Sequence, residues 1–290
     1  MANLKELRNK IGGIQSIRKV TSAMKLVAGV KLRKAEQKAV ASRDYAAELG
    51  KVLSGIHRDQ FDVPCELLCG REVIESELLV VFASDRGFCG NFNYLVYKAV
   101  LDQLESAKKS GRNILIWCVG AKIHNILKHR LSKDVHLELI PEFFKAEELL
   151  NNSNSLGHRI VRGFREHQFD RVSILFTRYY SVMRRTVQIQ ELIPVKYEES
   201  RDRTTTIFEP DIESVLCNLL PFNIGVQLYQ AALESVASEQ SARMSSMDNA
   251  TRNADDMLSG LKIRYNRTRQ QGITQELTEI VSGAEAISNG

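Results

Sequence analysis

The chain has 290 residues, of which 43% are hydrophobic and 26% are charged, and its formal net charge is +5 at pH 7. These fractions are typical of folded proteins and exclude an intrinsically disordered chain. No apolar run approaches the roughly 20 residues of a membrane-spanning helix, and the first residues lack the apolar core of a signal peptide. We therefore expect a soluble protein, a class that includes subunits docked on membrane assemblies.

Residues 1–57 are predicted to form one long helix. Apolar or small residues recur at three- and four-residue spacing over Leu4–Ile56, and no proline interrupts them. The small residues in the middle of this seam allow a partner helix to approach closely. Gly12, Gly13 and Gly29 each cost about 1 kcal/mol relative to alanine inside a helix, which indicates a crowded site or a bend.

The middle of the chain, residues 76–200, alternates short apolar runs with amphipathic segments. This alternation predicts an α/β domain with an open, largely parallel, Rossmann-like sheet. Linkers are predicted on either side, at residues 58–75 and 201–210, from their proline, polar and charged residues. The predicted strands are residues 78–83, 113–119, 135–140, 171–177 and 187–193, and the predicted helices are residues 92–107, 121–129 and 144–164.

Residues 211–290 are predicted to form a second long helix. Two apolar seams at three- and four-residue spacing, separated by a short break, indicate a coiled coil rather than a globular-domain helix. Some 75 helical residues reach roughly 110 Å, far beyond a compact domain, so this helix needs another long helix as its partner. The seam residues are Met247, Ala250, Ala254, Met257 and Leu261, followed by Ile273, Leu277, Ile280, Ala284 and Ile287.

The charges of the two terminal helices are complementary. Residues 1–57 contain twelve Lys or Arg and four Asp or Glu, whereas residues 211–290 contain ten acidic and six basic residues. An antiparallel pair places these opposite charges across one seam. The predicted fold is therefore an α/β domain inserted into a long antiparallel coiled coil of the N- and C-terminal helices.

The candidate nucleotide-binding loop is Ser84–Asn91, between a predicted strand and a predicted helix. A dinucleotide-binding loop occupies this place, but Ser84–Asn91 offers only Gly-x-x-Gly and puts Phe88 where backbone must approach phosphate. It also lacks the Lys-Ser/Thr pair of a P-loop. We favour a structural turn, and a nucleotide-binding enzyme built on this domain is the alternative.

Cysteines and histidines form no recognisable site. The five cysteines lack a spaced framework, which favours reduced thiols in a cytosol-like compartment. Cys65 and Cys69 have neither a second pair nor a nearby histidine to complete a zinc site. The histidines show no ligand spacing, and no nucleophile signature is present. We therefore predict no cofactor, no metal and no catalytic residue.

The basic residues allow two interpretations at each end of the chain. Those of residues 1–57 suit either nucleic acid or the solvated face of a coiled coil, and the scarcity of aromatic residues favours the coiled coil. In the last helix, five basic residues precede an apolar end. This order fits a shaft that passes through a ring of acidic surfaces into an apolar sleeve, and it also fits an ordinary helix end. The five are Arg252, Lys262, Arg264, Arg267 and Arg269.

One segment carries a specific signature. Ile273–Ala286 reads as an aliphatic residue, Thr, any residue, Glu, two residues, an acid, three residues and then Gly-Ala-x-small. This pattern resembles the signature of the gamma subunits of F-type ATP synthases at every required position. Ile14–Ala28, Ser84–Gly90 and Ala237–Met244 resemble the same family, in the same order along the chain. The resemblance therefore runs from end to end.

The resemblance implies a rotating central shaft. In this family the paired terminal helices stand inside a hexamer of alternating alpha and beta subunits, and the α/β domain sits with the epsilon subunit on the membrane-embedded c-ring. Ion flow turns ring and shaft, which drives the catalytic beta sites through their states and regulates ATPase activity. The resemblance also implies one non-catalytic copy per complex, no nucleic-acid partner, and a peripheral position on the membrane. The lack of a presequence favours a bacterium, and hence the cytoplasmic face of the inner membrane.

The same resemblance suggests roles for particular residues. One group matches the family's contact with the beta lever and catch loop, together with a position close to it on the N-terminal helix. That group is Arg269, Gln270, Thr274 and Glu276 on the last helix, and Met24 with Lys25 on the first. Phe208 and Glu209 match the foot on the c-ring, where Thr206 replaces the tyrosine usual in some members.

Overall fold

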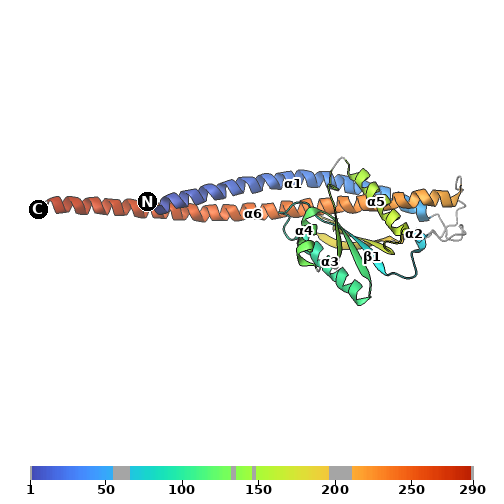
Figure 1. Ribbon diagram of the computed structural model, residues 1–290. Helices are drawn as coiled ribbons and strands as arrows, with labels where there is room; N and C mark the ends of the chain where they lie inside the picture. The colour runs from blue at the N-terminus through green and yellow to red at the C-terminus, as the bar shows by residue number, and fades with distance from the viewer. Residues whose placement is uncertain (1, 55–65, 132–134, 146–147, 196–210, 289–290) are drawn as a thin grey trace. The chain divides into compact units, whose positions relative to one another are not determined.

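The structure is a computed structural model that describes residues 2–54, 66–131, 135–145, 148–195 and 211–288 (Figure 1). The chain forms two compact units. We call residues 29–243 the sheet unit, and residues 1–28 with 244–290 the coiled-coil unit. Helices α1 (Ala2–Ser54) and α6 (Ile212–Ser288) each contribute residues to both units.

The sheet unit contains a five-stranded sheet in the order β3-β2-β1-β4-β5. The first four strands in this order are parallel, and β5 pairs antiparallel with β4 at one edge. The predicted open, largely parallel α/β sheet is thereby confirmed. The strands are β1 (Ser76–Phe82), β2 (Asn113–Val119), β3 (His136–Ile140), β4 (Arg171–Tyr179) and β5 (Arg185–Ile193).

Helices pack on both faces of the sheet, which explains why residues 78–82 of β1 form a continuous apolar run. Leu78 and Val80 join a buried cluster with residues of α5 and α6, whereas Leu79 and Val81 join a second cluster with residues of α3 and α4. Successive strand residues point to opposite faces, so a segment covered on both sides favours apolar residues at every position. The remaining helices are α2 (Glu66–Cys69), α3 (Phe92–Lys109), α4 (Ala121–Arg130) and α5 (Leu149–Arg165).

Several elements differ from the sequence-based expectation. Helix α5 begins at Leu149, not at residue 144. The aromatic residues before it lie in a turn, and the ring of Phe143 packs edge-on against Phe82 with centroids 5.7 Å apart. Their apolar spacing therefore reflects a turn that fills the core rather than a helix. Helix α2 lies within the predicted linker, and β4 continues to Tyr179, two residues beyond its predicted end.

Helix α6 is continuous, so the break expected between its two apolar seams is helical, and the helix also includes Pro221. It passes very close to α5. A Cβ atom built on Gly157 of α5 would lie 3.2 Å from the backbone nitrogen of Gly225 on α6. Glycine at both positions thus lets the two backbones meet. Within the described parts of the chain, none of the helices combines the length and apolar composition that a membrane span requires.

Candidate functional site: the paired terminal helices

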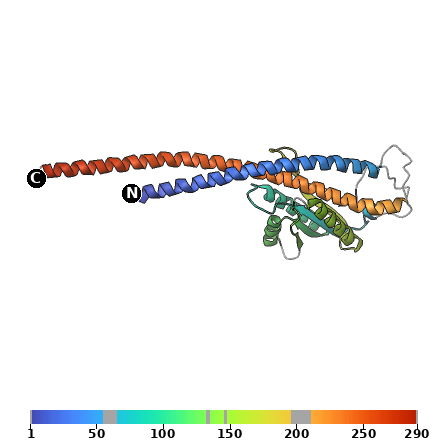
Figure 2. The same cartoon turned by 90° about the horizontal axis from the view of Figure 1, so that it is seen from above.

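Helices α1 and α6 run antiparallel in the coiled-coil unit (Figure 2). They bury a narrow seam between them. The buried positions recur at helical spacing on both helices, and most carry small or unbranched side chains. They are Leu7, Thr21 and Ala28 on α1, and Met247, Ala254 and Leu258 on α6. Because a seam of small side chains permits close approach, the predicted coiled coil of the two chain ends is confirmed.

Polar side chains connect the two helices along this seam. Lys25 Nζ donates a hydrogen bond of 2.6 Å to Asp248 Oδ1, and Arg18 forms an ion pair with Asp255. The predicted charge complementarity is therefore present as specific pairs. The hydrogen bond from Lys25 is the main cause that holds the pKa of Asp248 below its ordinary value of 3.8. The hydroxyl oxygens of Thr21 and Thr251 lie 2.8 Å apart.

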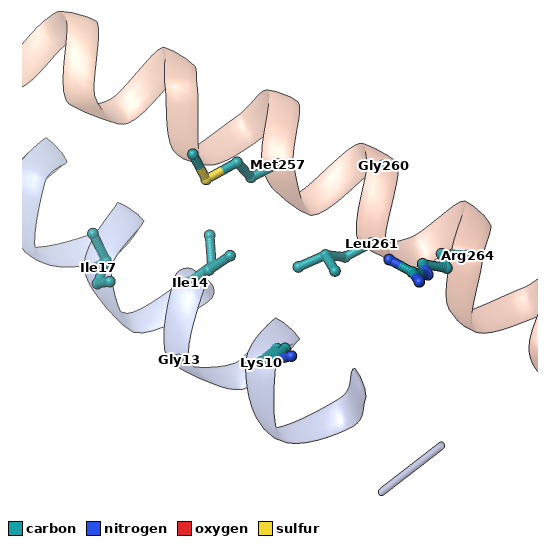
Figure 3. A pocket seen from close by; sticks show the side chains of 8 residues that line it. All are labelled: Lys10, Gly13, Ile14, Ile17, Met257, Gly260, Leu261 and Arg264. Atoms are coloured by element: carbon teal, nitrogen blue, oxygen red, sulfur yellow. The ribbon is translucent and has the colours of Figure 1, made fainter. Parts of the chain in front are cut away.

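The predicted seam is not buried along its whole length. Ile17 and Met257 are 57% and 59% exposed, because the helices diverge toward the start of α1 (Figure 2). An open groove of about 630 Å³ lies there. Gly13 and Gly260 contribute no side chain to fill it, while Ile14 and Leu261 extend into the space between the helices (Figure 3). Lys10 and Arg264 line the same groove and give it positive charge.

Among the described residues of the coiled-coil unit, the last part of α6 has no helical partner. Extrapolating the register of the Lys25–Asp248 pair puts the start of α1 opposite about residue 271, and α6 runs on beyond that level (Figures 1 and 2). The apolar seam of this segment consequently lies open to solvent. Its exposed side chains are Ile273 (49%), Leu277 (58%), Ile280 (67%) and Val281 (56%). We call residues 272–284 the tip segment.

The predicted contact residues fall into two separate places. Met24 and Lys25 are half-buried on α1, opposite Asp248. Arg269, the first of the other four, lies 21 residues further along α6, or about 30 Å at 1.5 Å per residue. The two groups are therefore separated along the helices, and their roles in a contact with other subunits stay predictions. Arg269, Gln270, Thr274 and Glu276 are all exposed, and the Thr274 hydroxyl donates to the Gln270 carbonyl at 3.0 Å.

The predicted foot, Thr206, Phe208 and Glu209, lies outside the described residues. Cys65, the first residue of the cysteine pair weighed as a zinc site, lies outside them as well. Among the residues that the structure does describe, no group of three His, Cys, Asp or Glu side chains could hold a metal ion.

The loop weighed as a nucleotide site contacts α6. Arg243 of α6 donates from Nη2 to the Gly87 carbonyl at 3.1 Å and forms a 2.6 Å ion pair with Glu239. Burial is the main cause that raises the pKa of Glu239. Phe88, at a φ of +63°, is 72% exposed. The loop thus holds α6 against the sheet domain through this hydrogen bond, a role that its own sequence did not indicate.

The sequence is similar to that of a known family over almost its whole length. A family model described as ATP synthase matches residues 3–287. The ATP synthase gamma chain of Pelagibacter ubique is 39% identical over 296 residues, covering 99% of this chain and 100% of that protein. The ATP synthase gamma chain of Dinoroseobacter shibae is 40% identical over 293 residues, with the same coverage of both chains.

Solved structures share the fold. A chain of the Euglena gracilis mitochondrial ATP synthase, in an assembly of OSCP, F1 and c-ring, matches with a TM-score of 0.67 and 19% identity, covering 99% of this chain and 95% of that one. A chain from the central stalk and c-ring of the Tetrahymena thermophila mitochondrial enzyme gives a TM-score of 0.58 and 21% identity, covering 80% and 99%.

Proposed function

This chain belongs to the ATP synthase gamma chain family, and on that premise we propose how its helices perform the work of a rotor. The protein is the shaft of the central stalk. It couples ion flow through the membrane c-ring to ATP synthesis at the beta subunits. Its partners are the alpha and beta subunits, the epsilon subunit and the c-ring.

The observation that carries this function is the open apolar seam of the tip segment. Four aliphatic side chains at helical spacing are half-exposed or more, and apolar stripes of this kind mark interaction surfaces. Exposed Arg264, Arg267 and Arg269 precede them on α6. A basic belt followed by an apolar end suits a shaft that enters an acidic collar and then a narrow apolar sleeve.

The shaft is also asymmetric along its length. Two helices are paired over one part of the coiled-coil unit, the groove opens where they diverge, and α6 alone continues as the tip segment. A partner shifts an equilibrium only if it binds two states with different affinity. A shaft with different faces at different angles meets this condition, because each rotor angle favours a different set of beta-subunit conformations.

Two groups of residues have proposed roles in this cycle. Met24 and Lys25 meet the stator at the level where the helices pair, and a second group meets it about 30 Å further along α6. The second group is Arg269, Gln270, Thr274 and Glu276. The exposure of the second group and the partial exposure of the first support these roles. Thr206, Phe208 and Glu209 form the proposed foot on the c-ring.

The shaft is proposed to be non-catalytic, so that it transmits torque while the beta subunits carry out the chemistry. One copy serves each complex, at the cytoplasmic face of the bacterial inner membrane. The hydrogen bond from Arg243 to the Gly87 carbonyl supports the non-catalytic role, because it engages the loop best placed to bind a nucleotide with α6.

The test is co-expression of this chain with alpha and beta subunits, followed by native mass spectrometry and an ATPase assay. We expect one copy held by an alpha–beta hexamer, with ATPase activity that depends on its presence. A homodimer that never engages the hexamer would favour a coiled-coil scaffold instead. Nucleotide binding by the free chain would favour the enzyme alternative. A change in the gel mobility of DNA at low salt would favour the nucleic-acid-binding alternative.

A further inference from the structure

Strand β4 extends beyond its parallel neighbour. The pairing of β1 with β4 ends at Val81 and Leu175, while β4 itself continues to Tyr179. The last residues of β4 therefore have a strand partner only on the β5 side. Backbone groups left without partners in a protein interior are costly, so something other than a strand must satisfy the other side.

Side chains of α6 satisfy the first of these residues, Thr177. Its backbone N–H donates to Ser235 Oγ at 3.3 Å, and its carbonyl accepts from Ser238 Oγ at 2.9 Å. Both serines are buried. Two hydroxyl groups from successive turns of a helix thus take the place of a neighbouring strand.

The second residue, Tyr179, is bound by both terminal helices. Its backbone N–H donates to Glu234 Oε2 of α6 at 2.9 Å, and its carbonyl accepts from Arg43 Nη2 of α1 at 3.1 Å. Arg43 Nε also donates to Glu234 Oε1 at 2.7 Å. Glu234 is 1% exposed, and each of its two oxygens has a partner. The three groups form a closed ring that joins α1, α6 and the sheet.

We propose that this junction holds the sheet and both helices together as one body during rotation, and that Arg43 and Glu234 are positioning residues for rotary coupling. We name it the β4 clamp, defined as Arg43, Glu234, Ser235 and Ser238 bound to Thr177 and Tyr179. The proposal rests on the proposed function of the chain as a rotor shaft.

The physical reason lies in the direction of the load. Torque from the c-ring tends to slide the sheet past the helices. Apolar contact resists separation but is non-directional, so it opposes sliding weakly. Charge-assisted hydrogen bonds require defined distances and angles, so they oppose it strongly. A buried carboxylate with all its partners in place also cannot shift without leaving a charge unpaired, which is strongly unfavourable.

The test uses the complete ATP synthase, reconstituted in vesicles with Glu234→Gln in this chain. The readout is the ratio of ions pumped to ATP hydrolysed, followed with proton- and sodium-sensitive dyes. We expect this ratio to fall at least twofold, with the rate of hydrolysis retained. The control is Glu138→Gln on β3. Glu138 accepts two hydrogen bonds of 2.7 and 2.8 Å from Arg159 Nη2 of α5, so Glu138→Gln weakens an interaction between β3 and α5 and should leave the pumping ratio unchanged.

A second pair of variants separates the clamp from a general loss of packing. Arg43→Met leaves the Glu234 carboxylate with only the Tyr179 N–H, so the ratio falls further than in Glu234→Gln. The double variant, Arg43→Met with Glu234→Gln, should recover part of the lost pumping ratio. Once the guanidinium is absent, the glutamine amide can bind both the N–H and the carbonyl of Tyr179.

An unchanged ratio in Glu234→Gln overturns the proposal. So does a proportional loss of hydrolysis and pumping, which reports defective assembly alone. If Glu234→Gln does not assemble, Ser238→Ala removes a single bond of the β4 clamp, and its ratio decides in the same way. A wild-type chain that supports neither hydrolysis nor pumping refutes the proposed rotor function itself, a result distinct from failure of the clamp.

Discussion

The sheet unit and the coiled-coil unit hold their parts together by different means. In the sheet unit, large side chains such as Phe82, Phe164 and Phe169 are fully buried, and polar side chains such as Glu234 complete closed networks. In the coiled-coil unit the seam is narrow and the Arg18–Asp255 pair is about half-exposed on both sides. Exposed pairs contribute only about 0–1 kcal/mol each. One unit is therefore built for fixed internal geometry, and the other leaves its contact surface open to a partner.

The largest difference between the units is expected from glycine substitutions. Gly120, at a φ of +131°, would place a Cβ atom 2.6 Å from the Ala83 carbonyl oxygen. Backbone strain and this overlap together predict that Gly120→Ala destabilises the sheet unit by roughly 2–5 kcal/mol. Gly12 on α1 has open space around it, and Gly12→Ala should stabilise the helix by about 0.5–1 kcal/mol. Urea unfolding of the full chain measures the free energy of unfolding of both variants. Equal changes in the two variants would contradict the predicted difference between the units.

Truncation after Gly272 tests the open end of the coiled-coil unit. The change removes Ile273, Leu277, Ile280 and Val281, whose burial in a sleeve contributes up to about 0.8 kcal/mol per CH₂ group covered. We expect the alpha–beta complex to release the truncated chain at least tenfold more readily on dilution, measured by native mass spectrometry. A chain truncated after Gly283 keeps these side chains and serves as control. Equal release of both chains would contradict the sleeve.

Met24→Lys tests the paired part of the coiled-coil unit. Met24 is half-buried beside Lys25, whose charge is already paired with Asp248. A second cation there gains new charge-assisted contacts with the stator at some rotor angles, worth about 1–3 kcal/mol each. Assembly should survive while ATP-driven pumping weakens. Met24→Leu keeps the apolar character, so membranes with this control variant should pump normally. Normal ATP-driven pumping by Met24→Lys membranes would contradict the prediction.

The smallest effect is expected from Asp248→Asn. The Lys25 hydrogen bond lowers the pKa of Asp248, so the pair stabilises the unit above pH 3.8, and the contribution disappears as pH falls through the depressed pKa. Hydrogen exchange over residues 244–264 should therefore be faster in the variant at pH 7 and converge with wild type in strong acid. Glu6→Gln, which breaks a pair within α1 only, should leave residues 244–264 unaffected. A difference that persists below pH 2 would rule out the pair as its cause.

Sequence periodicity predicted most of the fold, and its failures have physical causes. Buried strands such as β2 are contiguous apolar runs, so Asn113–Val119 was predicted with both ends correct. Phe144 was assigned to a helix because the spacing of apolar residues does not distinguish a helix from a turn that fills a core. Ile17 and Met257 match the seam pattern, but periodicity contains no information on where two helices diverge.

The functional sites also divide into those that the sequence could predict and those that it could not. The signature in Ile273–Ala286 led to the family, because it is local in sequence. The β4 clamp was not predicted, because Arg43 and Glu234 are 191 positions apart and each is an ordinary charged residue within its own helix. Only the tertiary fold brings them to the end of β4, where the strand has no parallel neighbour. The roles of Arg269 and Glu276 remain predictions, since their partners belong to other chains.

The pairing of the two chain ends has a consequence for biosynthesis. Lys25 and Asp248 are 223 positions apart, so at roughly 5–20 residues per second the ribosome takes about 10–45 s to deliver the second after the first. During that interval α1 is completed but has no α6 beside it, and its apolar seam faces solvent or a chaperone. The shaft is thus the last part of the molecule to form during translation. A chain released before Asp248 carries an unpaired amphipathic helix that invites aggregation.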